Sequence, residues 1–338
     1  MKIKVNGSDF LFFNDITISM VLDSVASAFS FSARFNPKNP QHKELFRPLG
    51  YPKVEIYHDD GRLLLTGVVL NQNQKSKAEP ELITLSGYSK GGVLDDCNIP
   101  LTAYPLESLK RSLYDIASRL LNIFSLNLVV APNVLKDVNA IYEKTSAEPT
   151  DSITSYLAKL AAQRNIVLSH DEKGNIVLFR PNANAAPRYF FDSENTVDMS
   201  WSVNGQQLHS DIDVIRQPSE DNPGVSLADK AKNPLIGAYR PSVSILSSGK
   251  ETDTKRAADN KMASELSGLV LNLAFEKYVE VLIGDIIEVQ NEEVYLYQRT
   301  RFMVSAINLK ETETGITTEL SVVLPESYTG ETPKNIFA

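Results

Sequence analysis

The stretch IGDIIEVQNEEVYLYQRTRFMVSAINLKETETGITTELSVVLPESYTG, residues 283–330, decides the fold of this 338-residue chain. Its short apolar runs alternate with polar residues and are separated by turn residues, a pattern typical of antiparallel β-structure. A polar helix over residues 254–268 is predicted to lead into it. A similar β block opens the chain between residues 2 and 89, as in LLLTGVVLNQNQ and ELITLSGYS. We therefore expect two β modules separated by an αβ insert, a plan that suits a symmetric building part better than a catalyst.

The composition is that of an ordinary globular protein, with 42% hydrophobic and 22% charged residues. The length allows two to four domains with a core each. The single cysteine, Cys97, has no disulfide or metal partner at a suitable spacing, and we predict a small buried side chain at a strand end. No apolar run approaches the roughly 20 residues that span a bilayer, and the N-terminus does not read as a signal peptide. We expect no membrane segment and a protein made and kept in the cytoplasm.

The net charge of −8 is distributed unevenly. Residues 1–102 carry 11 basic and 11 acidic side chains, residues 103–187 carry 9 and 8, and residues 188–338 carry 14 and 23. The whole acidic excess therefore lies in the C-terminal part. An anionic surface repels phosphate groups, so this part does not resemble a surface that grips nucleic acid. A negative wall past which DNA slides without sticking is compatible with it.

The first module shows two-residue alternation in KIKV, ITISMVL and AFSFSARF. Asp59-Asp60-Gly61 lies between two alternating runs, VEIYH and RLLLTGVVL, and predicts a hairpin. The polar, proline-containing stretch over residues 36–52 is too long for a tight turn. We expect an exposed loop or short helix there, available to a partner.

The insert begins near Thr102 and is predicted to hold two helices. The first follows Pro105 and has apolar residues at three- and four-residue spacing from Leu106 to Phe124. A strand, LNLVVA, follows it. The second helix opens at Thr150 or Asp151, and a hairpin around Gly174 closes the unit. Two apolar helix faces against a small sheet predict one compact core.

Residues 182–187, NANAAP, read as a linker to the second module. TVDMSWSV (196–203) and SDIDVIRQ (210–217) are predicted strands of that module. A polar segment interrupts it, and PSEDNPG (218–224) and SSGKETDT (247–254) look like mobile loops.

The predicted fold class is α+β and mainly β, with two similar antiparallel β-barrel modules. Residues 1–102 form the first barrel, residues 103–187 the α+β insert, and residues 188–217 and 261–330 the second barrel. Residues 218–260 form a polar loop and helix excursion, and residues 331–338 a C-terminal tail.

Residue types that carry catalysis or bind metals are sparse. The histidines lie on different predicted elements, without metal-ligand spacing: His42, His58, His170 and His209. The sequence has no P-loop, no GxGxxG and no GxSxG. Adjacent carboxylates occur at Asp59-Asp60, Asp95-Asp96 and Glu292-Glu293. Because neighbours on a strand point to opposite faces, none of these pairs supplies the two carboxylates that a glycosidase holds at one site. We predict no catalytic, cofactor-binding or metal-binding residues, and no cofactor.

Two other groups of residues invite a binding hypothesis. Aromatic residues could form a sugar platform: Tyr189, Phe190, Phe191, Trp201 and Tyr239. Alternation instead places Trp201 on one face with Met199 and Val203, which favours the barrel core. The basic run Lys255, Arg256 and Lys261 is interleaved with Asp253 and Asp259, which favours a solvated helix face.

Three segments, in this order, resemble the baseplate hub proteins of contractile-tailed phages of the Mu type, a family that extends to late-control tail proteins and the N-terminal part of VgrG in type VI secretion. SGYSKGGVLDDCNIPL (86–101) is similar to a strand and Gly-x-Ser-Lys stretch before an Asp-Cys motif. Residues 149–181 resemble the family's helix and hairpin. Residues 283–328 resemble its closing barrel, with Gly284-Asp285 before a strand and Pro325-x-x-Tyr328 at the end.

The resemblance implies a structural hub. A tail tube has sixfold symmetry and a spike is usually a trimer, so their closed interfaces do not match directly. Three copies of a two-barrel chain give six barrels in a ring. The implied partners are a homotrimer, the tail tube ring, the central spike protein, other baseplate proteins, and DNA that passes through the lumen without specific binding. The implied final location is the virion tail.

Two alternatives from other classes stay open. A cell-wall-degrading tail enzyme of the glycosidase type would use two carboxylates that only folding brings together. A carbohydrate-binding β module would be a monomer that depends on exposed aromatic residues.

Overall fold

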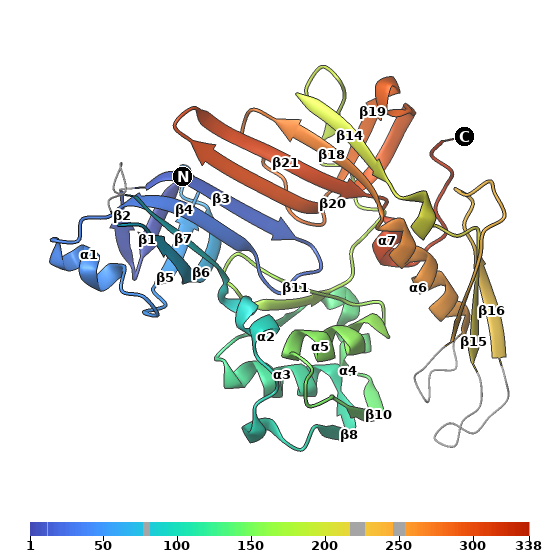
Figure 1. Cartoon of the computed structure of the whole chain (residues 1–338). Coiled ribbons are helices and arrows are strands. Elements are labelled where there is room, and N and C mark those ends of the chain that lie inside the picture. Colours follow the sequence, from blue (N-terminus) through green and yellow to red (C-terminus); the bar gives the residue numbers. More distant parts are fainter. Residues whose placement is uncertain (12, 77–81, 217–226, 246–253, 338) are drawn as a thin grey trace. The chain divides into compact units, whose positions relative to one another are not determined.

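The computed structural model describes residues 1–11, 13–76, 82–216, 227–245 and 254–337 (Figure 1). The chain forms two compact units. Unit 1 comprises Met1–Arg180, Glu276–Val279 and Ala306–Thr318, and unit 2 comprises Pro181–Phe275, Glu280–Ser305 and Glu319–Ala338. The predicted fold class, α+β and mainly β, is confirmed. Within the described residues, no helix is both long enough and apolar enough to cross a membrane.

The first module of unit 1 is a strongly paired antiparallel sheet. Its elements are β1 (Lys2–Val5), β2 (Ser8–Phe10), β3 (Phe13–Val21), β4 (Ala28–Arg34), α1 (Pro40–Leu45), β5 (Lys53–Tyr57), β6 (Leu63–Gln74) and β7 (Leu82–Ser89). The strand order is β3-β4-β7-β6-β5-β1-β2. The predicted hairpin is confirmed: β5 and β6 pair, and Gly61 takes the left-handed φ of 91° that the turn requires. The predicted short helix over residues 36–52 is α1, which Asn39 caps.

The C-terminal part of the chain completes this module. Residues 306–311 of the long strand β20 (Leu296–Thr312) pair with residues 16–21 of β3. The pairing joins segments about 290 residues apart, and Ile16, Ile18, Ile307 and Leu309 on the two strands are buried. Unit 1 is therefore complete only when the last quarter of the chain has folded onto it.

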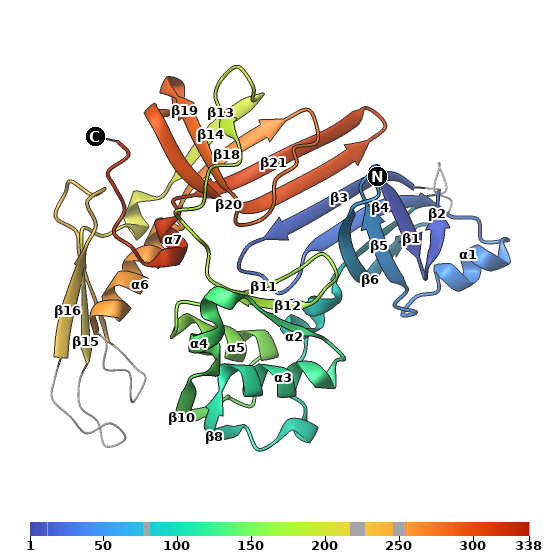
Figure 2. The ribbon, with the colours of Figure 1, turned by 180° about the vertical axis from the view of Figure 1, so that it is seen from behind.

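The insert also lies in unit 1. Its elements are η1 (Lys90–Gly92), α2 (Val93–Asp96), η2 (Leu101–Ala103), β8 (Glu107–Ser112), α3 (Leu113–Ile123), β9 (Leu128–Val130), η3 (Pro132–Val134), α4 (Leu135–Asn139), β10 (Ile141–Ser146), α5 (Ile153–Ala162), β11 (Val167–His170) and β12 (Ile176–Phe179). β8 pairs with β10, and β11, β12 and β9 form a second small sheet beside the helices (Figure 2). The hairpin around Gly174 is confirmed.

Two helix boundaries predicted for the insert were wrong. The first helix starts at Leu113, because the side chains of Ser112 and Asp115 form a reciprocal capping box there. The preceding residues, which include Leu109, form β8 instead and pair with β10, and Leu109 is 59% exposed. The second helix is capped by Ser152, not by Thr150 or Asp151, because the Ser152 hydroxyl accepts the Ser155 N–H at 3.1 Å.

The insert core is apolar and continuous with the first module. The predicted faces of α3 and α5 are buried together with Leu94, Ile176 and Leu178. Val25, from the first module, belongs to the same cluster. Cys97 corrects a prediction: it is half-buried and follows α2, so it does not lie at a strand end.

Unit 2 holds the second β module. Its elements are β13 (Phe190–Phe191), β14 (Asp198–Val203), η4 (Gly205–Gln207), β18 (Leu269–Phe275), β19 (Ile286–Asn291), η5 (Glu292–Val294), the first part of β20, the part of β21 (Gly315–Val323) from Glu319 onward, and α7 (Glu326–Thr329). Here the strand order is β14-β18-β21-β20, and β19 pairs with β20 and, in parallel, with β13. The predicted strand TVDMSWSV is β14.

A separate three-stranded sheet in unit 2 corrects the predicted polar excursion. β15 (Asp211–Arg216) lies between β16 (Leu227–Lys232) and β17 (Pro241–Ile245), and α6 (Thr254–Leu266) packs on this sheet through Ala258 and Met262. SDIDVIRQ therefore pairs with strands of the segment over 218–260, not with the second barrel. The sequence did not predict this sheet, because β16 is polar and lacks the apolar alternation of a strand. PSEDNPG and nearly all of SSGKETDT lie outside the described residues. The domain boundaries given above stay predictions.

The glycine-rich segment after β7 gives a test of packing between the first module and the insert. A Cβ at Gly91 would lie 2.0 Å from the Val25 carbonyl oxygen, whereas one at Gly205 would meet nothing within 4 Å. We expect Gly91→Ala to lower the free energy of unfolding by about 1–3 kcal/mol, and the control Gly205→Ala to change it by less than about 0.5 kcal/mol. Urea unfolding of both variants checks this, and equal effects would contradict the close contact.

Candidate assembly surfaces and polar joints

The adjacent carboxylates lie in turns and helix ends. Asp59 and Asp60 occupy the turn between β5 and β6, as predicted. Asp95 and Asp96 end α2, and Glu292 and Glu293 lie in η5 between β19 and β20. Their hydrogen bonds serve local structure: Asp96 accepts the Tyr88 hydroxyl at 2.6 Å.

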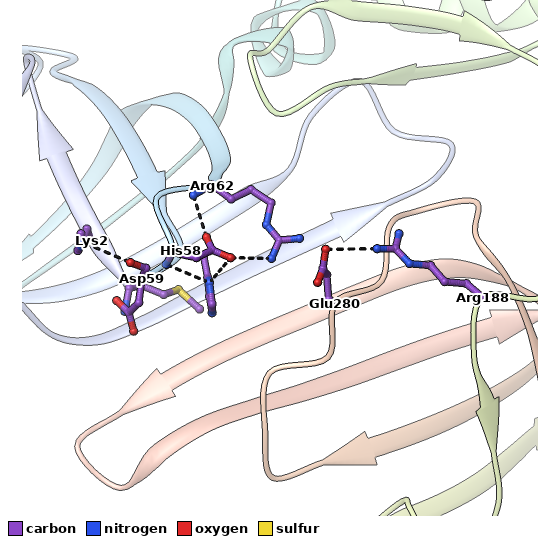
Figure 3. A network of polar contacts seen from close by, with 8 residues as sticks. Lys2, His58, Asp59, Arg62, Arg188 and Glu280 are labelled. Carbon is purple, nitrogen blue, oxygen red and sulfur yellow. Dashed lines mark hydrogen bonds and ion pairs between the residues drawn. The ribbon is translucent and has the colours of Figure 1, made fainter.

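A polar joint in unit 1 ties the start of the chain to the β5–β6 turn (Figure 3) and to the tip of β20. The amino group of Met1 lies 3.0 Å from Asp59 Oδ1 and 2.5 Å from Glu311 Oε2. Lys2 Nζ donates to the Asp59 carbonyl oxygen at 3.3 Å. The hydrogen bond from the amino group lowers the pKa of the Asp59 carboxyl. Two carboxylates do meet here, but a cation lies between them.

Side chains of the β5–β6 turn and of Tyr278 extend this joint. His58 Nδ1 and Arg62 Nη2 lie 3.1 and 3.0 Å from Asp60 Oδ2. The His58 ring stacks on Tyr278 with centroids 4.1 Å apart, and Arg62 lies over the same ring. The joint therefore connects the β5–β6 turn to residues 276–279, which belong to the same unit.

A second joint, in unit 2, explains the Gly-Asp motif at 284–285. Gly284 takes a left-handed φ of 86°, and Asp285 Oδ2 accepts the Leu282 N–H at 2.8 Å and Arg188 Nη1 at 3.0 Å. Arg188 also reaches Glu280 at 3.3 Å (Figure 3). Arg188 thus fixes the entry to β19 by pairing with two carboxylates.

His170 joins the insert to the first module within unit 1. Its Nδ1 lies 2.7 Å from the Ser24 carbonyl oxygen, and its Nε2 lies 2.6 Å from Ser27 Oγ. The neutral ring satisfies both contacts: Nδ1–H donates to Ser24 and Nε2 accepts the Ser27 hydroxyl proton. Burial lowers the pKa of His170, because desolvation disfavours the charged ring.

The other histidines serve separate elements. His42 Nδ1 accepts the Asn36 N–H at 3.1 Å, and His209 contacts the buried Glu265, which also accepts the His209 N–H. The structure does not gather the histidines. Within the described ranges, no group of three or more His, Cys, Asp or Glu side chains is placed to hold a metal ion.

The prediction that Trp201, Met199 and Val203 share a buried face of the barrel was wrong in part. Trp201 and Met199 are half-buried, but Val203 is 55% exposed, because β14 is an edge strand that pairs only with β18. The Trp201 indole donates to the Val294 carbonyl oxygen at 2.7 Å, and its ring packs against Phe302 and Phe337.

The other aromatic residues do not form one platform. Tyr189 stacks on Phe191, Arg299 lies over the Phe190 ring, and Tyr239 is 80% exposed. The basic run lies on the exposed side of α6, where Lys255 pairs with Asp259 at 2.6 Å, as predicted for a solvated face. Asp253 lies outside the described residues.

Exposed apolar side chains mark surfaces suited to contact. The insert exposes Leu101 (81%) and Ile141 (62%), and the edge strand β17 exposes Val243 (62%) and Ile245 (65%). The loop after α1, predicted to be available to a partner, exposes Leu49. Exposed apolar residues on edge strands favour pairing with another chain.

These features define a class of protein: a mainly β chain whose first and last β modules flank an α+β insert, with polar joints that fix neighbouring segments. Two solved tail proteins share this fold along almost their whole length. The 43 kDa tail protein of prophage MuSo2 from Shewanella oneidensis has a TM-score of 0.78 at 19% identity, covering 96% of this chain and 98% of that one. A tail protein from Neisseria meningitidis MC58 has a TM-score of 0.78 at 18% identity, covering 97% of each chain.

A type VI secretion component shares the fold more distantly. The Escherichia coli c3393 protein, described as structurally similar to bacteriophage T4 tail proteins, has a TM-score of 0.62 at 10% identity, covering 99% of this chain and 80% of that one. No family model and no curated protein matches the sequence. The resemblance drawn from the three segments is confirmed at the level of the fold.

The joint at His170 predicts a pH dependence of stability. Its pKa is lower in the folded protein than the usual value of about 6.5, so the unfolded chain binds more protons as the pH falls below that value. The contribution of His170 to stability is therefore complete above about pH 6.5 and declines from there down to its folded pKa. Urea unfolding between pH 7.5 and 5 should show this decline, and His170→Gln should make it shallower. A slope unchanged by His170→Gln, while His42→Gln changes it, would contradict the assignment.

Proposed function

We propose that this chain is a structural baseplate hub of a contractile tail, which joins a tail tube to a central spike. The observation that carries the proposal is the shared fold with two tail proteins over 96–97% of this chain and nearly all of theirs. A likeness of this extent includes both β modules and the insert. It therefore favours a role that uses the whole chain, and not one local site.

The architecture supports a ring of three copies. Two β modules per chain let a trimer present six β units toward a sixfold tube and three equivalent chains toward a threefold spike. The first β module, and the second one without the separate sheet of β15, β16 and β17, would form the ring, while the insert and that separate sheet contact neighbouring baseplate proteins. The exposed side chains of Leu101 and Ile141, and of Val243 on β17, are available for such contacts. The final location would be the virion tail, after assembly in the host cytoplasm.

The charge distribution supports a passive channel. Residues 188–338 carry the whole acidic excess. Acidic side chains around a lumen would keep DNA from adhering while it passes. The proposed interaction with DNA is therefore passage without specific binding.

The ring proposal predicts a trimer of the full chain. Light scattering should give a mass three times that of one chain, and averaged electron micrographs should show a ring with threefold symmetry and six similar lobes. The physical reason is that edge strands and exposed apolar residues become buried between copies. A monomer at every concentration, alone and with the spike protein of the same particle, would contradict the proposal.

The cell-wall enzyme hypothesis makes a separate prediction. A glycosidase needs a carboxyl group whose pKa is raised, and burial raises the pKa of Glu326, which lines a cavity in unit 2 with Glu331. If the chain is structural, the wild-type protein and Glu326→Gln should both leave purified peptidoglycan undegraded. Turnover by the wild type that Glu326→Gln abolishes would establish the enzyme instead. The control Glu319→Gln changes a carboxylate outside this cavity.

A further inference from the structure

A polar cavity of about 570 Å³ lies within unit 2. One wall is the start of β20, Tyr297–Arg301, and the other is the C-terminal segment, including Lys334–Phe337. Leu324–Glu326, which follow β21, also line it. This volume is typical of ligand pockets, which range over about 300–1,000 Å³.

The cavity follows an open strand edge. β21 has nine residues and joins β20 through a two-residue turn, so it can pair only with about the last nine of the seventeen residues of β20. β3 also pairs in that half, at 306–311, and the first half pairs with β19 alone. The other edge of the first half therefore has no strand partner among the described strands. Residues 297–301 all line the cavity. Successive side chains of a strand point to opposite faces of the sheet, so a cavity over one face would contact only every second residue. The unbroken run therefore indicates a groove along the edge of the strand.

The charged side chains of the groove lie near one another without forming a direct ion pair: burial raises the pKa of Glu326, and Lys334 and Arg301 both act through space to lower it, with a smaller effect. Arg301 Nη2 donates to the Ala185 carbonyl oxygen, but Arg301 Nε is buried without a partner. Within the described residues, no ion pair involves Arg301, Lys334 or Glu326. The guanidinium of Arg301 and the exposed amino group of Lys334 both line the cavity, so these two cations are the groups that an incoming acceptor would meet.

We propose that this groove binds an extended peptide segment of a partner protein, which adds a strand to the open edge of β20 and places a carboxylate on Arg301 and Lys334. Strand addition supplies partners for the backbone groups of β20. The carboxylate would form charge-assisted hydrogen bonds with the guanidinium of Arg301 and the amino group of Lys334. Tyr295 and Tyr297, 57% and 56% exposed, can pack against alternate side chains of the segment.

Charge complementarity selects an acidic segment. The cavity lining holds three basic side chains, Arg299, Arg301 and Lys334, against two acidic ones, Glu326 and Glu331, in the part of the chain that holds the acidic excess. Burial raises the pKa of Glu326, which weakens its opposition to an incoming carboxylate. An acidic segment would therefore be repelled by most of this part of the surface and attracted at the groove.

The experiment uses the full chain and a random decapeptide library in mRNA display. Selected peptides are then synthesised with a fluorescent label in three forms: unchanged, with acidic side chains replaced by amides, and with an amidated C-terminus. We expect the selected peptides to carry an acidic residue among alternating apolar ones. Replacing the carboxylate should weaken binding about tenfold or more, as for the loss of a charge-assisted contact. The amidated C-terminus distinguishes a side-chain carboxylate from a terminal one.

Variants of the chain test the same contact by fluorescence polarisation. Arg301→Gln should weaken binding about tenfold, and Lys334→Gln severalfold. The control Lys310→Gln removes one positive charge from the other half of β20 and should leave binding unchanged. Lys334 is exposed, so Lys334→Gln keeps the test valid if Arg301→Gln does not fold.

Three results would overturn the proposal: no peptide enriched over a mock selection, binding unaffected by both groove variants, or a dimer of the chain that Arg301→Gln dissociates. The proposal does not rest on the ring, because unit 2 builds the groove by itself. A trimer without peptide binding would refute the groove alone, and peptide binding by a monomer would refute the ring alone.

Discussion

The pairing of β3 with the tip of β20 is the contact on which the rest of unit 1 depends. It places residues 306–311 beside residues 16–21, and Glu311 beside the amino group of Met1. Closing a loop of about 290 residues carries an entropic cost that grows only slowly with length, so a modest buried contact can offset it. This pair cannot form before the end of the chain is present, and such non-local contacts slow folding.

The polar joints described above fix one segment of the chain against another. Met1 lies between two carboxylates, Arg188 pairs with Asp285 and Glu280, and His170 holds two serines of the first module. A carboxylate neutralised by a fixed cation is a poor general acid, since its pKa falls. The polar residues that looked like candidate chemistry in the sequence are thus mainly used for positioning.

The sequence predicted the elements whose burial pattern is regular. Two-residue alternation located β3, β4 and β6, and helical spacing located α5 with its buried face. The start of α3 was misjudged because Leu106 and Leu109 continue the helical spacing into a segment that the Ser112 cap excludes from the helix. Apolar spacing alone cannot show at which residue a capping side chain makes the helix begin.

The parts that could not be predicted depend on partners far away in the chain. β16 reads LADKAK, which has no strand signal of its own, and it forms because β15 pairs with it and α6 packs on one face of their sheet. Trp201 was assigned to the core because a strand pattern cannot tell an edge strand from a central one. The groove at Arg301 was also missed, because the sequence does not show which strand edges are left open. This edge is open only because β21 is shorter than β20.

The difference in length between β20 and β21 is the basis of the proposed docking site. A sheet protein usually protects its edges, since unpaired N–H and C=O groups recruit other chains. Here the first half of β20 lies beside a cavity that the C-terminal segment also lines, together with Arg301 and Lys334. An edge that only had to be protected would be covered and not left beside a cavity. The proposed segment would therefore gain affinity from backbone pairing and selectivity from its carboxylate.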